Sequence, residues 1–275
     1  MSKRVLVSTL VALVLAVLVA ACSPAAQPPT PAAETEASEA AGIPRSADGK
    51  PDFTGVYTVG GVEDIRDNLT PGSEIVFTDF GLKRIKENNL AIDPNTRCLP
   101  WGPTRMMCCT AMPIAFVNHK DLIVIITESQ QTFRLVYMDG RPVPEDLYDS
   151  EGNVDPQVGG WMGFSTGKWE GDTLVVDTVG ADDRTWLDGH GGHQHSNKMK
   201  LTERFQPTDA MTISYTATID DPITYQKPWS FAKTFAKQPN DRILSHACME
   251  NERDLQYMQP LPVMGTRPHK PGARD

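Results

Sequence analysis

Short runs rich in apolar, β-branched and aromatic residues fill the chain from about residue 113 onward. The first three are PIAFV, LIVIITES and QTFRLVYM, at 113–117, 122–129 and 131–138. Runs of this length and composition predict β-strands, and the polar turn at 119–121 predicts a hairpin between the first two.

The same pattern continues through the rest of the chain. A short strand is predicted over 53–59, a hairpin over 161–180 with its turn at 170–172, and further strands at 199–205, 212–219, 229–235 and 242–248. Eight or nine strands separated by turns indicate an all-β domain. We expect a mostly antiparallel barrel of the lipocalin-like kind, or else a sandwich.

One short helix is predicted, from residue 78 or 79 to about 88. Asp79 can cap its N-terminus, and Phe80, Leu82 and Ile85 recur at helical spacing. Helical content outside this segment is expected to be low.

The first 21 residues predict an export signal. Lys3 and Arg4 precede an almost unbroken apolar run that ends on small residues, which is the arrangement of a signal peptide. The segment VAAC at 19–22 resembles the lipobox of bacterial lipoproteins, and this resemblance implies lipidation of Cys22. Ser23 follows the cysteine where inner-membrane lipoproteins often carry aspartate. We therefore expect a cell-envelope protein, lipid-anchored, in the outer membrane rather than the inner membrane.

Residues 22–45 predict a disordered tether between the lipidated cysteine and the folded part. The segment is rich in Pro, Ala and Glu and poor in aromatic residues, so it cannot bury enough apolar surface to fold. No second linker or repeat follows. We therefore expect residues 46–275 to form a single β domain.

The charge balance excludes nucleic acid as a partner. Removing Lys3 and Arg4 from the 26 basic residues leaves 24 against 35 acidic residues, a net charge of −11. No basic run is present to neutralise a phosphate backbone. The partners expected are a small-molecule ligand and, through the lipid anchor, the membrane; the oligomeric state is left open.

Four cysteines follow Cys22, and the envelope outside the inner membrane is oxidising. Adjacent cysteines seldom pair because the ring they close is strained. We therefore favour a disulfide between Cys98 and Cys248 over one between Cys108 and Cys109. A zinc site is the alternative, although no C-x-x-C spacing supports it.

Several blocks of sequence, in order, resemble a family of uncharacterised bacterial exported proteins. They include ADGKPD at 47–52, RCLP at 97–100, YMDGRP at 137–142, WEGDTLVVDT at 169–178 and CMEN at 248–251. The resemblance covers most of the predicted domain. It implies export and a common fold, but no established activity.

A glycine-rich segment, WLDGHGGHQHS at 186–196, carries half of the six histidines. Imidazole and carboxylate groups so close together favour a metal site made by His193 and His195, with His190, Asp188 or Glu203 as a further ligand. The cupin metal motif places a glutamate about four residues after its H-x-H pair, whereas Glu203 lies eight residues after His195. A solvated histidine-rich loop is the alternative.

Glu203 lies between Leu201 and Phe205 on one face of a predicted strand. A carboxylate desolvated between apolar neighbours has a raised pKa, as a general acid or base near neutral pH requires. The alternative is a structural ion pair with an arginine, either Arg134 or Arg184.

Aromatic side chains predict the wall of a ligand pocket. Trp186, beside the histidine segment, is the first choice, and Trp161, Tyr137 and Tyr225 are further candidates. Arg134 is also a candidate, but its odd spacing from Tyr137 puts the two on opposite faces of one strand, so the inward face is left open.

A soft-donor group is formed by Met106 and Met107 beside Cys108 and Cys109. These sulfur atoms suit Cu(I), although apolar packing and disulfide formation explain the same residues.

Three functions follow from these observations. The first is an envelope lipoprotein whose barrel binds a small hydrophobic or aromatic molecule. The second is a lyase, isomerase or hydrolase without an organic cofactor, in which His195 and Glu203 act as acid and base while Asp188 or Arg204 orients them. The third is a metal-binding envelope protein. Motifs of serine hydrolases, phosphate-binding loops and dinucleotide sites are missing from the sequence, so no cofactor is expected beyond a metal ion.

Overall fold

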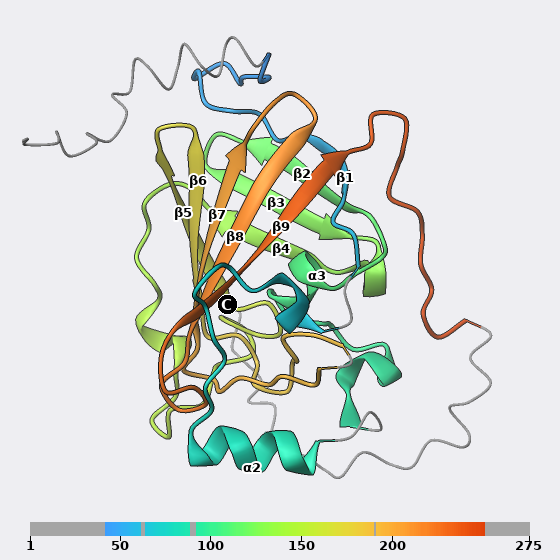
Figure 1. Cartoon of the computed structure of the whole chain (residues 1–275). Helices are drawn as coiled ribbons and strands as arrows, with labels where there is room; N and C mark the ends of the chain where they lie inside the picture. Colours follow the sequence, from blue (N-terminus) through green and yellow to red (C-terminus); the bar gives the residue numbers. More distant parts are fainter. Residues whose placement is uncertain (1–41, 62–63, 89–91, 190, 251–275) are drawn as a thin grey trace, which may run out of the picture.

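The protein is seen in a computed structural model that describes residues 42–61, 64–88, 92–189 and 191–250 (Figure 1). Nine strands close into a barrel in chain order: β1 Gly55–Thr58, β2 Ile114–His119, β3 Leu122–Thr127, β4 Phe133–Tyr137, β5 Phe164–Glu170, β6 Thr173–Val179, β7 Lys200–Pro207, β8 Thr212–Asp220 and β9 Trp229–Lys237. The predicted all-β barrel is thus confirmed, and the sandwich alternative is wrong.

The barrel closes through one parallel pair of strands. An odd number of strands cannot alternate in direction all the way around, so two neighbours must run the same way. These are β4 and β5, which pair Val136 with Ser165 and Tyr137 with Thr166, whereas every other neighbouring pair, including β1 with β9, is antiparallel. The connection 138–163 therefore returns along the barrel, and it carries the short 3-10 helix η5, Glu145–Leu147.

Large side chains fill the barrel interior. Leu201, Glu203 and Phe205 of β7 are buried on one face, as the period of two predicts, while their neighbours point outward. The ring of Tyr215 stacks on that of Phe235, with centroids 4.9 Å apart, and is tilted against that of Phe205, with centroids 5.0 Å apart. The interior of the described barrel is therefore a packed core rather than an open lipocalin-like cavity.

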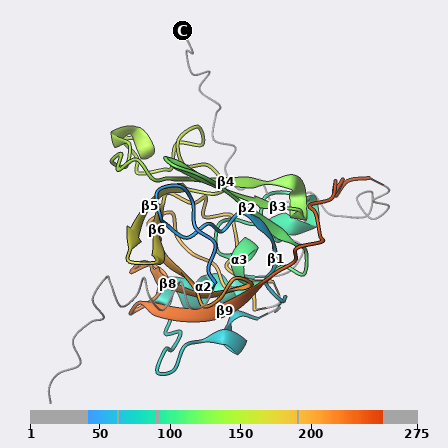
Figure 2. The same ribbon diagram turned by 90° about the horizontal axis from the view of Figure 1, so that it is seen from above.

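A four-residue helix, α3 Arg105–Cys108, lies within the ring of strands when the barrel is viewed from above (Figure 2). Met106, Met107 and Cys108 belong to the main core cluster and are almost fully buried. Both methionines pack against apolar side chains. Apolar packing therefore accounts for them, and this was the alternative to a Cu(I) site in the sequence analysis.

The predicted helix is α2, Asp79–Glu87, with one change at its N-terminus. Thr78, not Asp79, caps it: the Thr78 hydroxyl accepts the N–H of Gly81 at 3.2 Å. Besides η5, the described residues contain three further 3-10 helices: η1 Ile65–Asn68, η3 Pro94–Arg97 and η4 Ser129–Gln131.

The strand predicted over 242–248 is wrong. The segment has no regular structure, because β1 and β9 pair with each other and the closed barrel leaves no edge for a further strand. It is held instead by the Cys98–Cys248 disulfide and by a hydrogen bond of 2.8 Å from the Leu244 N–H to the Glu128 carboxylate.

Both ends of the predicted organisation lie outside the described residues: the signal peptide, Cys22, the tether up to residue 41, and residues 251–275. Among the described residues, no helix has the length and apolar character needed to span a bilayer.

Candidate metal site at one end of the barrel

One end of the barrel gathers the loops that carry the polar residues singled out in the sequence. The loops 180–199 and 221–228 follow β6 and β8 there, and α2 lies at the same end (Figure 1). Within the first loop, Trp186 pairs with Gln194 in an isolated bridge, and the Leu187 N–H donates to the His193 carbonyl at 2.8 Å. The loop is therefore a short hairpin, with Asp188 and His193 on either side of its tip.

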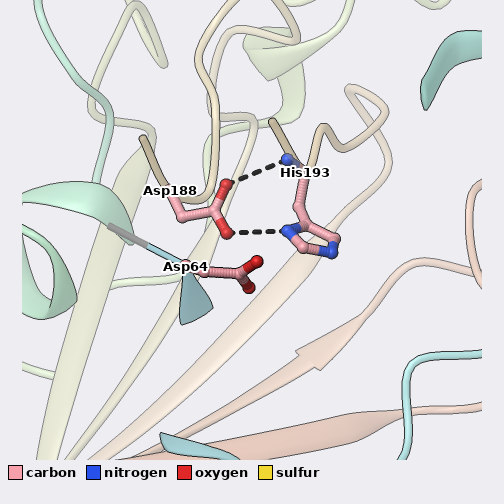
Figure 3. A group of neighbouring side chains, drawn as sticks. All are labelled: Asp64, Asp188 and His193. Atoms are coloured by element: carbon pink, nitrogen blue, oxygen red, sulfur yellow. Dashed lines mark hydrogen bonds and ion pairs between the residues drawn. The ribbon is translucent and has the colours of Figure 1, made fainter. Parts of the chain in front are cut away.

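Asp188 and His193 are joined by two hydrogen bonds (Figure 3). The Asp188 carboxylate accepts the backbone N–H of His193 at 2.9 Å and lies 2.6 Å from its Nδ1. It also accepts the N–H of Ile65 at 2.9 Å. Asp188 is completely buried and His193 is 3% exposed, so the carboxylate fixes the imidazole in a site that excludes most water.

Asp64 completes a cluster of three possible metal ligands. One carboxylate oxygen of Asp64, one of Asp188 and one ring nitrogen of His193 all lie within 4.8 Å of one another. Figure 3 shows the Asp64 carboxylate beside the edge of the imidazole that faces Asp188. Asp64 is partly exposed, which leaves the cluster open on one side.

The electrostatics favour the ionised form of Asp64. Its pKa is lowered, mainly because the Arg66 guanidinium donates hydrogen bonds to its carboxylate at 2.9 and 3.0 Å, and the charge of His193 acts in the same direction. Asp64 therefore remains a carboxylate at neutral pH and can serve as a metal ligand.

Aromatic rings wall the cluster. The Phe77 ring lies parallel to the imidazole of His193, with 6.0 Å between centroids. It also packs against the ring of Tyr225. The Tyr225 hydroxyl donates to the Gln194 carbonyl at 2.6 Å. These apolar surfaces shield the cluster and hold the hairpin against the barrel.

Gly191 is required by the close approach of the two ligands. A Cβ at this position would lie 2.3 Å from an Asp188 carboxylate oxygen and 2.6 Å from His193 Nδ1. Any side chain here would collide with both groups. The glycine-rich composition of the loop thus has a specific steric cause at this residue.

His195 does not join this cluster, contrary to the prediction that it would bind metal beside His193. Its Nε2 lies 2.7 Å from the Thr185 hydroxyl, and its Nδ1 lies 2.8 Å from the Ser196 carbonyl. Both ring nitrogens are therefore occupied by protein groups, and complete burial lowers its pKa. His195 holds the loop in shape.

Glu203 belongs to a polar network inside the barrel rather than to an acid–base pair. Both carboxylate oxygens accept from the guanidinium of Arg134, and the Tyr215 hydroxyl donates to one of them at 2.8 Å. Arg134 also donates to Ser165 and Thr178. His195 and Glu203 have separate hydrogen-bond partners, and Glu203 forms the ion pair with Arg134 that the sequence offered as the alternative to an acid–base pair.

The two residues predicted to orient the acid–base pair, Asp188 and Arg204, lie in different parts of the structure. Arg204 points outward from β7 and donates to Glu170 at 2.9 Å, so it has no role beside Glu203. Arg184 pairs with Asp182 and lies over the ring of Trp161. Asp188 alone of the predicted catalytic residues lies in the cluster.

Of the predicted ligand-binding residues, only Trp186 and Tyr225 lie near the cluster, and both are buried in the walls of the loops. Arg134 is inside the barrel, while Tyr137 stacks with Phe164 and carries Arg141 over its ring. The five residues therefore do not form one pocket.

Three residues that hold the site were not singled out in the sequence. Arg84 of α2 donates to Gln194, to the His195 carbonyl and to the Asp183 carbonyl, and so clamps the hairpin. Asp221 accepts both the N–H and the hydroxyl of Ser196 at 2.6 and 2.7 Å. Asp64 supplies the third possible ligand. No local sequence pattern marks these residues, because their partners lie about 100 positions away or in a neighbouring loop.

All four cysteines of the domain are oxidised. Cys98 is joined to Cys248, which confirms the predicted pairing. Cys108 is joined to Cys109, against the expectation that adjacent cysteines would not pair. These sulfurs therefore provide no thiolate for zinc or Cu(I), and the alternative metal sites based on cysteine are wrong.

No protein-family model and no characterised protein matches this sequence. The functional argument consequently rests on the geometry of the site.

Proposed function

We propose that this protein is an envelope lipoprotein whose barrel domain binds a divalent transition-metal ion through Asp64, Asp188 and His193. The observation that carries the proposal is the convergence of two carboxylates and one imidazole within 4.8 Å at the loop end of the barrel. Two of the three side chains, Asp188 and His193, are buried, so most water is excluded from that side of the cluster.

The donor set supports a first-row divalent metal. Imidazole suits Zn²⁺, Ni²⁺, Cu²⁺ and Fe²⁺, while carboxylates also accept Mn²⁺. A divalent cation would be attracted by the negative charges of Asp64 and Asp188, although Arg66 already pairs with Asp64. Three protein ligands leave room for water or a small ligand on the open side, as in catalytic rather than structural zinc sites.

The hydrogen bond between Asp188 and His193 Nδ1 sets the competition between metal and proton. A ring nitrogen that carries a proton cannot coordinate a metal, so a metal at Nδ1 would displace that proton to Nε2 or to solvent. Protons and metal compete for the imidazole and the carboxylates, so metal affinity should decrease as the pH is lowered.

Isothermal titration of the purified full-length protein with Zn²⁺ or Co²⁺ tests the proposal. We expect one site per chain, with affinity reduced at least tenfold in Asp64→Asn. Asp67→Asn, an exposed acidic residue of η1, is the matched control and should bind like the wild type. Equal affinity in the two variants, or no binding by the wild type, would refute the metal site.

The envelope location is proposed from the N-terminal sequence alone. Cys22→Ser should move the protein from the membrane fraction to the soluble envelope fraction, because the anchor lies outside the barrel. Retention of this variant in the membrane would rule out lipid anchoring at Cys22.

A second candidate function is binding of a small apolar molecule, for which one hollow provides support. It has a volume of about 370 Å³ and lies between the outer face of β3 and β4 and residues 243–244, with Val124, Ile126 and Phe133 in its lining. This volume is within the range of small-molecule sites. Leu244→Glu should abolish binding of 1-anilinonaphthalene-8-sulfonate, whereas Met211→Glu, at an exposed position between β7 and β8, should not. Dye binding that is unchanged in Leu244→Glu excludes this hollow.

A further inference from the structure

The Cys108–Cys109 disulfide lies directly beneath the hairpin that carries Asp188 and His193. The sulfur atoms of Cys108 and Cys109 lie 3.3 and 3.9 Å from the Leu187 carbonyl oxygen. Oxidised sulfur has no hydrogen to donate, so these are packing contacts in the disulfide state.

Leu187 connects this contact to both buried ligands of the proposed metal site. It immediately precedes Asp188, and its N–H donates to the His193 carbonyl at 2.8 Å. Leu187 is completely buried, so it has little freedom to absorb a change in its neighbours. A shift of its carbonyl would therefore be transmitted to Asp188 and His193.

The two cysteines differ in accessibility. Cys108 is completely buried, whereas Cys109 is partly exposed at the edge of the core cluster. Thiol–disulfide exchange begins when an external thiolate reaches one sulfur of a disulfide. Cys109 is therefore the cysteine that an external thiolate would reach, and Cys108 would be the leaving group.

The ring closed by adjacent cysteines involves no long loop. The Cys98–Cys248 disulfide, by contrast, closes a loop with a sequence separation of 150 residues. Reduction of Cys98–Cys248 would cost the folded protein the stabilisation that this cross-link provides by restricting the unfolded chain, whereas the ring at 108–109 provides little such stabilisation. Reduction should therefore be selective for Cys108–Cys109.

We propose that Cys108–Cys109 is a thiol–disulfide exchange site whose reduction weakens metal binding at Asp64, Asp188 and His193. An envelope dithiol attacks Cys109 Sγ, forms a mixed disulfide and releases Cys108 as a thiolate. The second thiol of the partner then attacks the mixed disulfide and releases Cys109. The two cysteines gain two electrons and, after protonation, two hydrogens; the partner is oxidised to its disulfide.

Reduction changes both the space and the hydrogen bonding at Leu187. The sulfurs are covalently bonded in the disulfide, whereas the two sulfur atoms of the reduced pair must separate to van der Waals distance. Each thiol also becomes a donor that can bond the Leu187 carbonyl. The hairpin must adjust to both changes. We expect this adjustment to move Asp188 and His193 away from the positions in which they can bind one metal ion together with Asp64.

The exchange is tested on the full-length protein in glutathione buffers of graded redox ratio, with alkylation and mass spectrometry of each cysteine. We expect Cys108 and Cys109 to become alkylated together while Cys98 and Cys248 remain oxidised. Reduction of both pairs at the same ratio, or persistence of Cys108–Cys109 after Cys98–Cys248 has opened, would overturn the exchange site.

The effect on metal binding rests on the proposed function and is measured separately. Co²⁺ affinity is compared in the oxidised protein, in the selectively reduced protein and in C108A/C109A, which has neither the cross-link nor free thiols. We expect at least tenfold weaker binding in the selectively reduced protein. Binding should be unchanged in C108A/C109A, where no thiol is present to crowd or bond the Leu187 carbonyl, and in the control C98A/C248A. Equal affinity in all forms would overturn the coupling.

The two proposals fail in different ways. No Co²⁺ binding by the oxidised protein refutes the metal site itself, and alkylation still decides whether Cys108–Cys109 exchanges. If C108A/C109A does not fold, the reduced wild-type protein decides the coupling. Its thermal transition shows whether the barrel remains intact during the measurement.

Discussion

Asp188 accepts hydrogen bonds from both the backbone and the ring of His193, at 2.9 and 2.6 Å, while the Ile65 N–H donates to the same carboxylate. One buried side chain therefore links the loop hairpin to η1 and fixes the imidazole. This relationship makes Asp188 both a structural acceptor and a possible metal ligand.

Asp188→Asn should lose metal binding and lower the free energy of unfolding. The amide offers one acceptor oxygen and a nitrogen whose hydrogens meet the existing N–H donors, and leaving buried groups unpaired costs about 1–3 kcal/mol. Denaturant unfolding of the metal-free protein measures the stability, with Asp67→Asn as the exposed control. An unchanged midpoint in Asp188→Asn would contradict the structural role.

The buried Arg134–Glu203 pair predicts a strongly non-additive double mutant. Removing one partner, as in Glu203→Leu, leaves an unpaired charge in the core and should destabilise the protein by about 3–5 kcal/mol. Arg134→Met combined with Glu203→Leu should recover much of that loss, because the double change removes both charges. Additive losses in the chemical denaturation of the two single variants and the double variant would show that the pair is not coupled.

His195 predicts a loss of stability in mild acid. Its pKa in the folded protein is lowered below the ordinary 6.5 because burial disfavours the charged ring. The unfolded chain therefore binds a proton at a pH where the folded protein does not. Stability should be complete above pH 6.5 and decrease below it, by at most about 1.4 kcal/mol per pH unit from this residue.

The measurement for His195 is the free energy of unfolding of the wild type and His195→Gln between pH 8 and about pH 5. The difference between the two proteins should shrink as the pH falls, because the variant lacks this titration. A difference that stays constant over the range would mean that His195 protonates equally in the folded and unfolded states.

The Cys98–Cys248 disulfide should stabilise the barrel. It ties the irregular segment after β9 to the region of η3, and loss of a disulfide of this kind costs about 2–5 kcal/mol. The variant C98A/C248A should therefore unfold at lower denaturant concentration with the barrel otherwise intact. A variant as stable as the wild type would show that this cross-link does not constrain the folded domain.

The strand pattern was predictable because successive residues of a strand point to opposite faces, so the alternation of apolar and polar residues shows which face is buried. Alternation and apolar composition located the strands from β1 to β9, and the inward position of Glu203 followed from the same period. The segment 242–248 has the same composition but no partner, since pairing of β1 with β9 had already closed the barrel. A segment with strand composition thus becomes a strand only if a sheet edge is free to pair with it. Amino-acid composition does not show whether such an edge exists.

The candidate site was only partly predictable. Asp188 and His193 stood out because they lie close together in a glycine-rich loop, but Asp64 lies 124 positions before Asp188 and is brought there by η1. His195 shares the same loop and residue type as His193, yet it faces Thr185 instead. In an irregular loop, spacing does not determine side-chain direction, so the two histidines could not be distinguished before the fold was known.

The metal site is tested most directly by X-ray diffraction from crystals of the full-length protein grown with Zn²⁺, recorded on both sides of the zinc absorption edge. The account predicts one strong anomalous peak within bonding distance of Asp64, Asp188 and His193, about 2.0–2.2 Å from each ligand atom. A crystal that shows no zinc between these three side chains, with the Asp188–His193 hydrogen bond unchanged at saturating Zn²⁺, would contradict it.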